Sequence, residues 1–416
     1  MLNLYLFNDY DSSATYGIGS YLKELKSALY NNEIKIHIVH LHSERQNFEI
    51  VNTNEIENWF VPEVIRKNTF SGFISNIENY CRNVIYLLRI NIKETRNLIF
   101  HFNYNQYQYL AKELKNLFDC KTIITIHYMK WMLDLNGNLS RFNMIKKKTD
   151  EQKSSFEKSL LKTDEYEGLL FRQTDRVIAL SQYTRNLLCD EYQIEPEKVI
   201  VIPNGLDDIN LNMKTEKSFL RKKWHIAENE LVILFVGRLH PVKGLMFLIK
   251  AFRKVLSLNP GCRLVIAGDG SYDMYMNEAK DICMKINFTG FLEKKELSEL
   301  YQIADIGVFT SLSEQCSYVT MEMMMYSLPI ITTSASGLAE MTEDCISSFQ
   351  IPLIERTDKI EIDADFLADK IVYLLMNPTE AKLLGKNARK QFESKYTIDV
   401  FKNNMLNFYH SLYENK

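Results

Sequence analysis

Two glutamates, Glu314 and Glu322, flank the predicted start of a helix near Ser317. A helix N-terminus presents unpaired N–H groups and a positive dipole end, which favour an anion. Carboxylates only accept hydrogen bonds, so the two glutamates suit two sets of hydroxyls, such as the vicinal diols of a sugar and of a ribose. The structural alternative makes Glu314 a helix cap and Glu322 a surface residue. Tyr318 and Met321 indicate buried neighbouring helix faces, where an unpaired charge is costly, and this favours the first interpretation.

Two cations follow an apolar run in the second half of the chain. Arg238 and Lys243 come directly after the predicted strand Leu231–Val236, which is followed by Gly237. A glycine at a strand end lets the backbone approach a ligand closely. A forked guanidinium and a point-charge ammonium suit a diphosphate, whose charge must be neutralised as a bond to it breaks. Taken alone, this motif is better explained by a surface turn with two solvated cations.

The first half of the chain offers weaker signals. Gly17 and Gly19 precede a predicted helix, and backbone N–H groups beside them can cradle phosphate oxygens. Leu22 stands where the third glycine of a dinucleotide-binding fingerprint would be, so a Rossmann dehydrogenase is a poor fit. His127 ends a predicted strand, either at the ligand side of the sheet or in a purely structural role.

The elements that must position these residues follow an alternating βα pattern, which predicts an α/β fold with parallel sheets. Longer amphipathic stretches between the apolar runs predict the helices. The predicted strands are Leu2–Phe7, Ile36–Leu41, Leu98–Phe102, Thr122–His127, Arg176–Leu180, Val199–Ile202, Leu231–Val236, Arg263–Ala267, Ile286–Thr289, Ile306–Thr310 and Ile330–Thr333.

The chain has 416 residues, too many for one core, and this predicts two domains. We expect the break at Pro203-Asn204-Gly205, with a first domain at 1–208 and a second at 209–395. An amphipathic helix within 396–416 is expected to pack back on the first domain. Two doubly wound domains in tandem would face a central cleft, with ligands at the carboxyl ends of the strands.

Composition excludes several classes of protein. Apolar residues make up 46% and charged residues 25%, as in ordinary globular proteins, and a net charge of -3 argues against a nucleic-acid binder. Seven cysteines without a C-x-x-C pair argue against a disulfide framework or a structural zinc, and favour a reducing cytosol. The N-terminus predicts a strand and not a signal peptide. The basic segment Arg141–Lys162 predicts a solvated helix face, with peripheral contact to an anionic membrane or acceptor as the alternative.

In their order and spacing, the motifs resemble those of the retaining glycosyltransferases of family 4, or glycosyl transferases group 1, which have the GT-B fold. The resemblance covers nearly the whole chain. The chain has Cys316-Ser317 where the family usually has Phe-Gly, and Ser327 where it has Gly. The variant at 314–318 looks like a Bacteroidetes-type branch. The matching motifs are Glu314 to Glu322 for E-x7-E, Gly237-Arg238 to Lys243-Gly244 for G-R-x4-K-G, Pro203-Asn204-Gly205, Ser336-Gly337-Leu338-Ala339-Glu340, and the glycines Gly17 and Gly19.

The resemblance implies two Rossmann-like domains facing a central cleft, with the acceptor domain at 1–208 plus the helix in 396–416 and the donor domain at 209–395. It also implies a role for each matching residue. Arg238 and Lys243 would bind the nucleotide diphosphate and stabilise it as the leaving group, and Gly237 would belong to the donor-binding site. Glu322 would bind the ribose, Glu314 with the amides of Cys316, Ser317 and Tyr318 would hold the donor sugar, and His127 would line that sugar. Gly17 and Gly19 would let the first loop reach the phosphates. The expected catalytic residues are Glu314, Arg238, Lys243 and His127.

The implied activity is transfer of a hexose from a UDP- or GDP-sugar to a hydroxyl of a glycan, a lipid-linked sugar or a peptide. Retention of anomeric configuration, no cofactor, no metal and a cytoplasmic location are expected, and acceptor contacts are expected in loops 42–54 and 131–140. Asp207-Asp208 is not a D-x-D motif, and Asp363 is expected to cap a helix. A GT-B epimerase, a phosphorylase and a non-catalytic nucleotide-sugar-binding protein remain alternatives.

Overall fold

The computed structural model describes residues 1–9, 17–30, 33–63, 70–208 and 216–414. These residues form two compact units. Unit 1 comprises 1–130, 149–205 and 398–416, and unit 2 comprises 131–148 and 206–397. Each unit is built on its own parallel sheet, and each is described separately below.

Unit 1 has an eight-stranded sheet in the order β3-β4-β2-β1-β5-β6-β7-β8. All neighbours pair in parallel except β3 with β4, which form an antiparallel hairpin. The strands are β1 (Leu2–Asp9), β2 (Ile34–Ser43), β3 (Glu49–Thr53), β4 (Ile56–Pro62), β5 (Leu98–Phe102), β6 (Cys120–Ile126), β7 (Arg176–Ala179) and β8 (Val199–Val201). The helices are α1 (Gly17–Leu29), α2 (Phe70–Asn91), α3 (Gln108–Leu117), α6 (Ser155–Gln173), α7 (Gln182–Tyr192), a 3-10 turn at Pro196–Lys198 and α16 (Ile398–Glu414).

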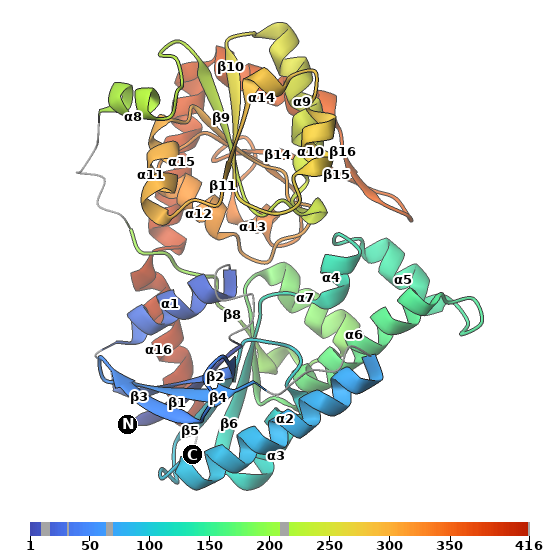
Figure 1. Ribbon diagram of the computed structural model, residues 1–416, viewed down its shortest axis with the longest axis vertical. Coiled ribbons are helices and arrows are strands. Elements are labelled where there is room, and N and C mark those ends of the chain that lie inside the picture. The colour runs from blue at the N-terminus through green and yellow to red at the C-terminus, as the bar shows by residue number, and fades with distance from the viewer. Residues whose placement is uncertain (10–16, 31–32, 64–69, 209–215, 415–416) are drawn as a thin grey trace. The chain divides into compact units, whose positions relative to one another are not determined.

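The central strands of unit 1 are apolar on both faces because helices cover both sides of the sheet, as in parallel α/β folds. Leu4, Leu6 and Phe100 are fully buried. Helices α1 and α16 lie side by side, and α3 packs between α2 and α6 (Figure 1). Helix α16 is anchored by Tyr409, whose hydroxyl lies 2.7 Å from Nδ1 of His101 on β5.

Unit 2 has a six-stranded, fully parallel sheet in the order β11-β10-β9-β12-β13-β14, plus a separate antiparallel pair, β15-β16. The strands are β9 (Leu231–Val236), β10 (Cys262–Ala267), β11 (Ile286–Gly290), β12 (Ile306–Phe309), β13 (Ile330–Thr333), β14 (Phe349–Ile351), β15 (Leu353–Glu355) and β16 (Ile360–Ile362). The helices are α4 (Lys130–Asp134), α5 (Leu139–Lys147), α8 (Lys217–Lys223), α9 (Leu245–Leu258), α10 (Asp273–Glu278), α11 (Lys294–Ile303), α12 (Tyr318–Met325), α13 (Leu338–Met341), α14 (Ala364–Met376) and α15 (Pro378–Lys395), with 3-10 turns at Pro241–Lys243 and Cys283–Lys285.

Helices cover both faces of the second sheet. Helix α9 packs beside α10 and α14, and α12 packs beside α15 (Figure 1). Asp363 caps α14 by accepting from the amides of Asp365 and Phe366, both at 3.0 Å, which confirms the predicted capping role. Within the described residues, no helix is long and apolar enough to cross a membrane.

The α/β class with two doubly wound parallel sheets is confirmed, and every predicted strand is present. Two segments differ from their predictions. Residues 42–54, predicted as an acceptor loop, contain the end of β2 and the whole edge strand β3. Residues 131–140, predicted as a loop of the first domain, contain α4, begin α5 and group with unit 2. There Asn138 Nδ2 donates to the carbonyl of Arg356 at 2.7 Å.

Candidate active site

The charged motifs of the second half meet at one edge of the unit 2 sheet. Strands β9 and β12 are direct neighbours, paired through Ile233 with Ile306. Because the pairing is parallel, their carboxyl ends lie at the same edge. Arg238 and Lys243 follow β9, and Glu314 follows β12. This edge is where ligands bind in open α/β sheets.

The backbone around Lys243 is held by a close approach between the two loops. Gly244 has a φ of +66°, and a Cβ atom there would lie 2.0 Å from the carbonyl oxygen of Thr310. Only glycine fits this position without moving one of the loops. Thr310 Oγ1 also donates to the carbonyl of Lys243 at 3.1 Å. The Lys243 side chain therefore starts from a fixed point, and its ammonium lies 5.5 Å from the centre of the Phe309 ring.

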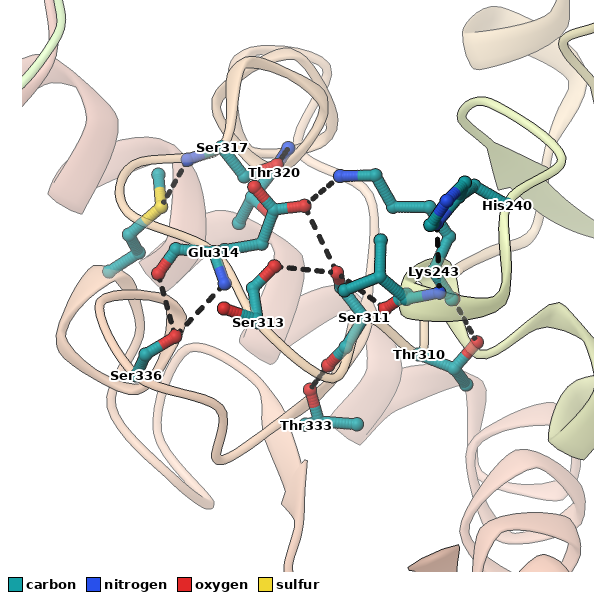
Figure 2. Close-up of polar contacts among 12 residues, drawn as sticks. His240, Lys243, Thr310, Ser311, Ser313, Glu314, Ser317, Thr320, Thr333 and Ser336 are labelled. Atoms are coloured by element: carbon teal, nitrogen blue, oxygen red, sulfur yellow. Dashed lines mark hydrogen bonds and ion pairs between the residues drawn. The ribbon is translucent and has the colours of Figure 1, made fainter. Parts of the chain in front are cut away.

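Lys243 and Glu314 point toward each other and form an ion pair (Figure 2). Ser311 Oγ lies 3.1 Å from the same Glu314 oxygen, Oε1. Ser336 fixes the Glu314 backbone, because its hydroxyl accepts from the Glu314 amide at 2.9 Å and donates to the Glu314 carbonyl at 2.8 Å. A cation and a carboxylate thus stand side by side, one suited to an anion and the other to hydroxyls.

Helix α12 begins as predicted. Ser317 is its N-cap, and the Ser317 hydroxyl accepts from the Thr320 amide at 3.2 Å. Cys316 and Ser317 are both buried. The Ser317 amide, predicted to face a sugar, donates to Met341 Sδ at 3.1 Å. Of the three amides predicted to hold a ligand, this one is already engaged within the protein.

Glu322 lies in the second turn of α12 with its side chain partly exposed. The hydroxyl of Tyr301, on the neighbouring α11, donates to Glu322 Oε2 at 2.7 Å. Burial, reinforced by the adjacent Glu322 carboxylate, raises the pKa of Tyr301 well above its ordinary value, so the phenol stays protonated and remains a donor. Met321 is buried as predicted, and so are Met324 and Met325 on the same helix, whereas Tyr318, predicted to be buried with Met321, is only partly buried.

Arg238 stands at the same sheet edge but with an exposed side chain. The turn that carries it is tied to the loop after β10, because the Leu239 amide donates to the carbonyl of Asp269 at 2.7 Å. Gly237 approaches Gly268 so closely that a Cβ on Gly268 would lie 2.0 Å from the Gly237 carbonyl. The close approach therefore requires glycine at Gly268, after β10, whereas a Cβ on Gly237 would meet only ring carbons of Phe235 and Phe309 at 3.7–3.8 Å.

The remaining predicted site residues belong to unit 1. Gly17 and Gly19 lie in the first turn of α1 and not in a loop before it, while the polar loop 10–16 falls outside the described residues. Burial lowers the pKa of His127 to about 3, so the ring is neutral. Its Nε2 lies 3.1 Å from Oδ1 of Asn103 and donates to it. Nδ1 is then left without a proton and suits a hydroxyl that donates.

Sequence reasoning missed three residues that shape the site. Ser336 lies inside a motif already recognised, so its position carried a usable signal. Ser311 follows the predicted strand that ends before Glu314, and it also had a positional signal. Tyr301 had none, because it reaches Glu322 from another helix. In the described part of the chain, no group of three or more His, Cys, Asp or Glu side chains could hold a metal ion.

Comparison with known proteins relates this arrangement to two families. The family model described as glycosyl transferases group 1 matches residues 216–391, and the model described as glycosyltransferase family 4 matches residues 15–209. An uncharacterised glycosyltransferase of Methanocaldococcus jannaschii is 30% identical over 244 residues, which are 56% of this chain and 59% of that protein. The chain therefore spans less than two thirds of the length of this relative, and the same holds for the next relatives that it matches.

Solved structures show the same fold over the whole chain. Sucrose-phosphate synthase from Thermosynechococcus elongatus superposes with a TM-score of 0.77 at 16% identity, covering 100% of both chains. The Anabaena protein HepE in complex with UDP-glucose superposes with a TM-score of 0.70 at 16% identity, covering 99% of this chain and 100% of that one. The predicted GT-B fold is confirmed by these neighbours.

Proposed function

This chain belongs to the glycosyltransferase group 1 and family 4 proteins, and we propose that it transfers a hexose from a UDP- or GDP-sugar to a hydroxyl acceptor with retention of anomeric configuration. The observation that carries the proposal is the ion pair of Lys243 and Glu314 at the carboxyl edge of the unit 2 sheet. It supplies, at one place, a cation for a diphosphate and a carboxylate for sugar hydroxyls.

In this proposal, unit 2 binds the donor. Lys243 and Arg238 neutralise the charge that develops on the departing diphosphate. Preorganised charge of this kind makes the largest contribution to the rate enhancement of many enzymes. Glu322, held by Tyr301, accepts from ribose hydroxyls. Glu314 orients the donor sugar, so that the reaction depends on positioning and electrostatics and not on a strong general base. HepE, whose structures are described with UDP and with UDP-glucose, supports the choice of a nucleotide-sugar donor.

Unit 1 is proposed to hold the acceptor, a hydroxyl of a glycan, a lipid-linked sugar or a peptide. His127, neutral and with an accepting Nδ1, is proposed to contact the donor sugar. Gly17 and Gly19 are proposed to let the preceding loop reach the phosphates. The seven free cysteines agree with the proposed location in a reducing cytoplasm. The Bacteroidetes-type branch stays a prediction.

The test incubates the purified chain with a panel of UDP- and GDP-sugars, with and without hydroxyl acceptors. We expect calorimetric binding of one nucleotide sugar and transfer to an acceptor, with the anomeric configuration of the product followed by NMR. An inverted product would contradict retention. Epimerised sugar released without acceptor would favour the epimerase, and binding without any reaction would favour the non-catalytic alternative. Absence of binding to every nucleotide sugar would overturn the proposal.

A further inference from the structure

The Lys243–Glu314 pair joins two side chains to which the proposed function gives different parts of one ligand. Lys243 is assigned to the diphosphate and Glu314 to the sugar, yet in the structure they contact each other. Their side chains are only 16% and 14% exposed, so the pair is largely shielded from solvent. A contact between charges in such a setting is stronger than a surface ion pair.

The backbone that carries each member of the pair is also held in place. Gly244 and Thr310 hold the Lys243 loop against the loop that leads to Glu314, and Ser336 brackets the Glu314 backbone from the other side. Ser311 provides the carboxylate with a second hydrogen-bonding group at 3.1 Å. With both anchor points fixed, the two side chains meet unless a ligand separates them.

We propose that Glu314 makes the site selective for the sugar-bearing nucleotide over the bare nucleoside diphosphate, by competing with the diphosphate for Lys243. This inference rests on the proposed function and deepens it. Any diphosphate that takes the ammonium must displace the Glu314 carboxylate. The displaced carboxylate then loses its cation in a largely shielded place, which is costly unless other donors replace it.

The two nucleotides differ in the hydrogen-bond donors that they present to the displaced Glu314 carboxylate. The hexose of a nucleotide sugar presents hydroxyl donors where the carboxylate is released, so the lost ion pair is offset. A bare nucleoside diphosphate presents none. After transfer the sugar has left, so Glu314 pairs with Lys243 again, and the binding of the remaining nucleoside diphosphate is weakened. One carboxylate thereby both orients the donor and favours release of the product.

The experiment measures dissociation constants by calorimetry for UDP and UDP-glucose, and for GDP and GDP-mannose, using the pair that the wild-type protein binds. Glu314→Gln keeps the shape and removes the competing charge. We expect it to bind the bare diphosphate about tenfold more tightly, a change of one decade in affinity, while binding of the nucleotide sugar tightens less or weakens. The preference for the nucleotide sugar therefore falls.

Three further variants make the result specific. Glu343→Gln removes the same charge from an exposed residue of unit 2 and should leave both affinities unchanged. Glu314→Asp retracts the carboxylate and should shift the ratio in the same direction as Glu314→Gln. In a Lys243→Met background, Glu314→Gln should no longer tighten the bare diphosphate, since the competition acts through that ammonium.

The outcomes separate the two proposals. If wild-type protein binds nucleotides but Glu314→Gln leaves the affinity for the bare diphosphate unchanged or lower, the competition is refuted and the proposed function stands. If wild-type protein binds neither form of any nucleotide tested, both proposals fail together.

Discussion

The hydroxyl of Tyr301 lies 2.7 Å from Oε2 of Glu322 and donates a hydrogen bond to it, although the two residues come from different helices. One carboxylate oxygen is thereby engaged. That bond restrains the orientation of the Glu322 carboxylate. Tyr301 therefore acts on the proposed ribose contact only through Glu322, as a positioning residue.

Replacing Tyr301 by Phe should weaken donor binding and leave the chemical step nearly intact. A hydrogen bond to a charged group contributes about 1.5–3 kcal/mol, so we expect the donor KM to rise about tenfold or more while kcat changes less than about twofold. The preference for UDP over 2′-deoxy-UDP should also decrease, which a purely structural effect would not cause. Tyr326→Phe is the matched control, because Tyr326 stacks on Tyr301 at 5.1 Å but donates to Ser298.

Replacing Gly244 by Ala should disrupt the loop contact that fixes Lys243. The new methyl would lie 2.0 Å from the Thr310 carbonyl oxygen, and φ at this residue is +66°. We expect a loss of more than about 2 kcal/mol in the free energy of unfolding and weaker nucleotide binding, measured by urea titration and calorimetry. Gly261→Ala, whose methyl would meet only Asn259 Oδ1 at 3.3 Å, should change both quantities little. Equal effects of the two substitutions would refute this account.

Glu167 of unit 1 should make stability depend on pH. Burial raises the pKa of its carboxyl from 4.5 to about 8 in the folded chain, despite donors from Asn105 and the Lys130 amide. The folded state thus binds one proton more than the unfolded state between these values. The free energy of unfolding should therefore fall as pH rises through this window, on the order of 1.4 kcal/mol per pH unit.

The corresponding variant is Glu167→Gln, which removes the titrating group. Urea titrations at pH 5, 6.5 and 8 should show that the variant gains stability relative to wild type as pH increases. Glu165→Gln, an exposed carboxylate on the same helix, is the control and should run parallel to wild type. A constant difference between Glu167→Gln and wild type at all three pH values would contradict the shifted pKa.

Ser327 stands where the family usually has glycine, and it adopts a φ of +56°. The left-handed region costs a non-glycine residue about 1–2 kcal/mol, partly offset because glycine is more flexible in the unfolded chain. We expect Ser327→Gly to stabilise the protein by about 0.5–1 kcal/mol without changing activity. The same exchange at Ser257, inside helix α9, should instead destabilise by a similar amount. Thermal unfolding of both variants checks the two signs.

Removing divalent cations should not affect transfer. The proposed leaving-group contacts come from Arg238 and Lys243, and a metal is not needed to neutralise the diphosphate in that scheme. Activity measured after dialysis against EDTA should equal that before dialysis, and added Mg²⁺ or Mn²⁺ should not raise it. A strict requirement for Mn²⁺ would contradict metal-independent transfer.

Most elements of the fold could be predicted from local sequence patterns. The bounds of Leu231–Val236, Leu98–Phe102 and Ile330–Thr333 were predicted without error, because buried parallel strands are short apolar runs. The hairpin of β3 and β4 was not predicted. Strand β3 is an edge strand with mostly exposed residues, so it lacks the apolar signal, and its turn at Asn54 and Glu55 has positive φ at both residues without a glycine.

The site was predictable to the extent that its residues follow strands. Glu314 and Lys243 were found because strand ends mark ligand sites, whereas their direct contact depends on side-chain positions that spacing does not fix. The contact of Tyr301 with Glu322 and the placement of 131–148 in unit 2 could not be predicted for the same reason. Both depend on tertiary contacts, such as that of Asn138 with Arg356, between segments far apart in the chain.

Helix α16 packs against α1 and reaches β5 through Tyr409 and Tyr413, whose hydroxyl donates to the Leu98 carbonyl at 2.7 Å. The ribosome makes this helix only after all of 206–397, so unit 2 has every residue it needs while unit 1 still waits for its last piece. During that interval the surface of unit 1 that covers Phe401, Met405 and Phe408 in the folded chain is exposed to water and to other nascent chains. Translation products that end after residue 397 but before α16 is complete should therefore expose apolar surface on unit 1 and not on unit 2.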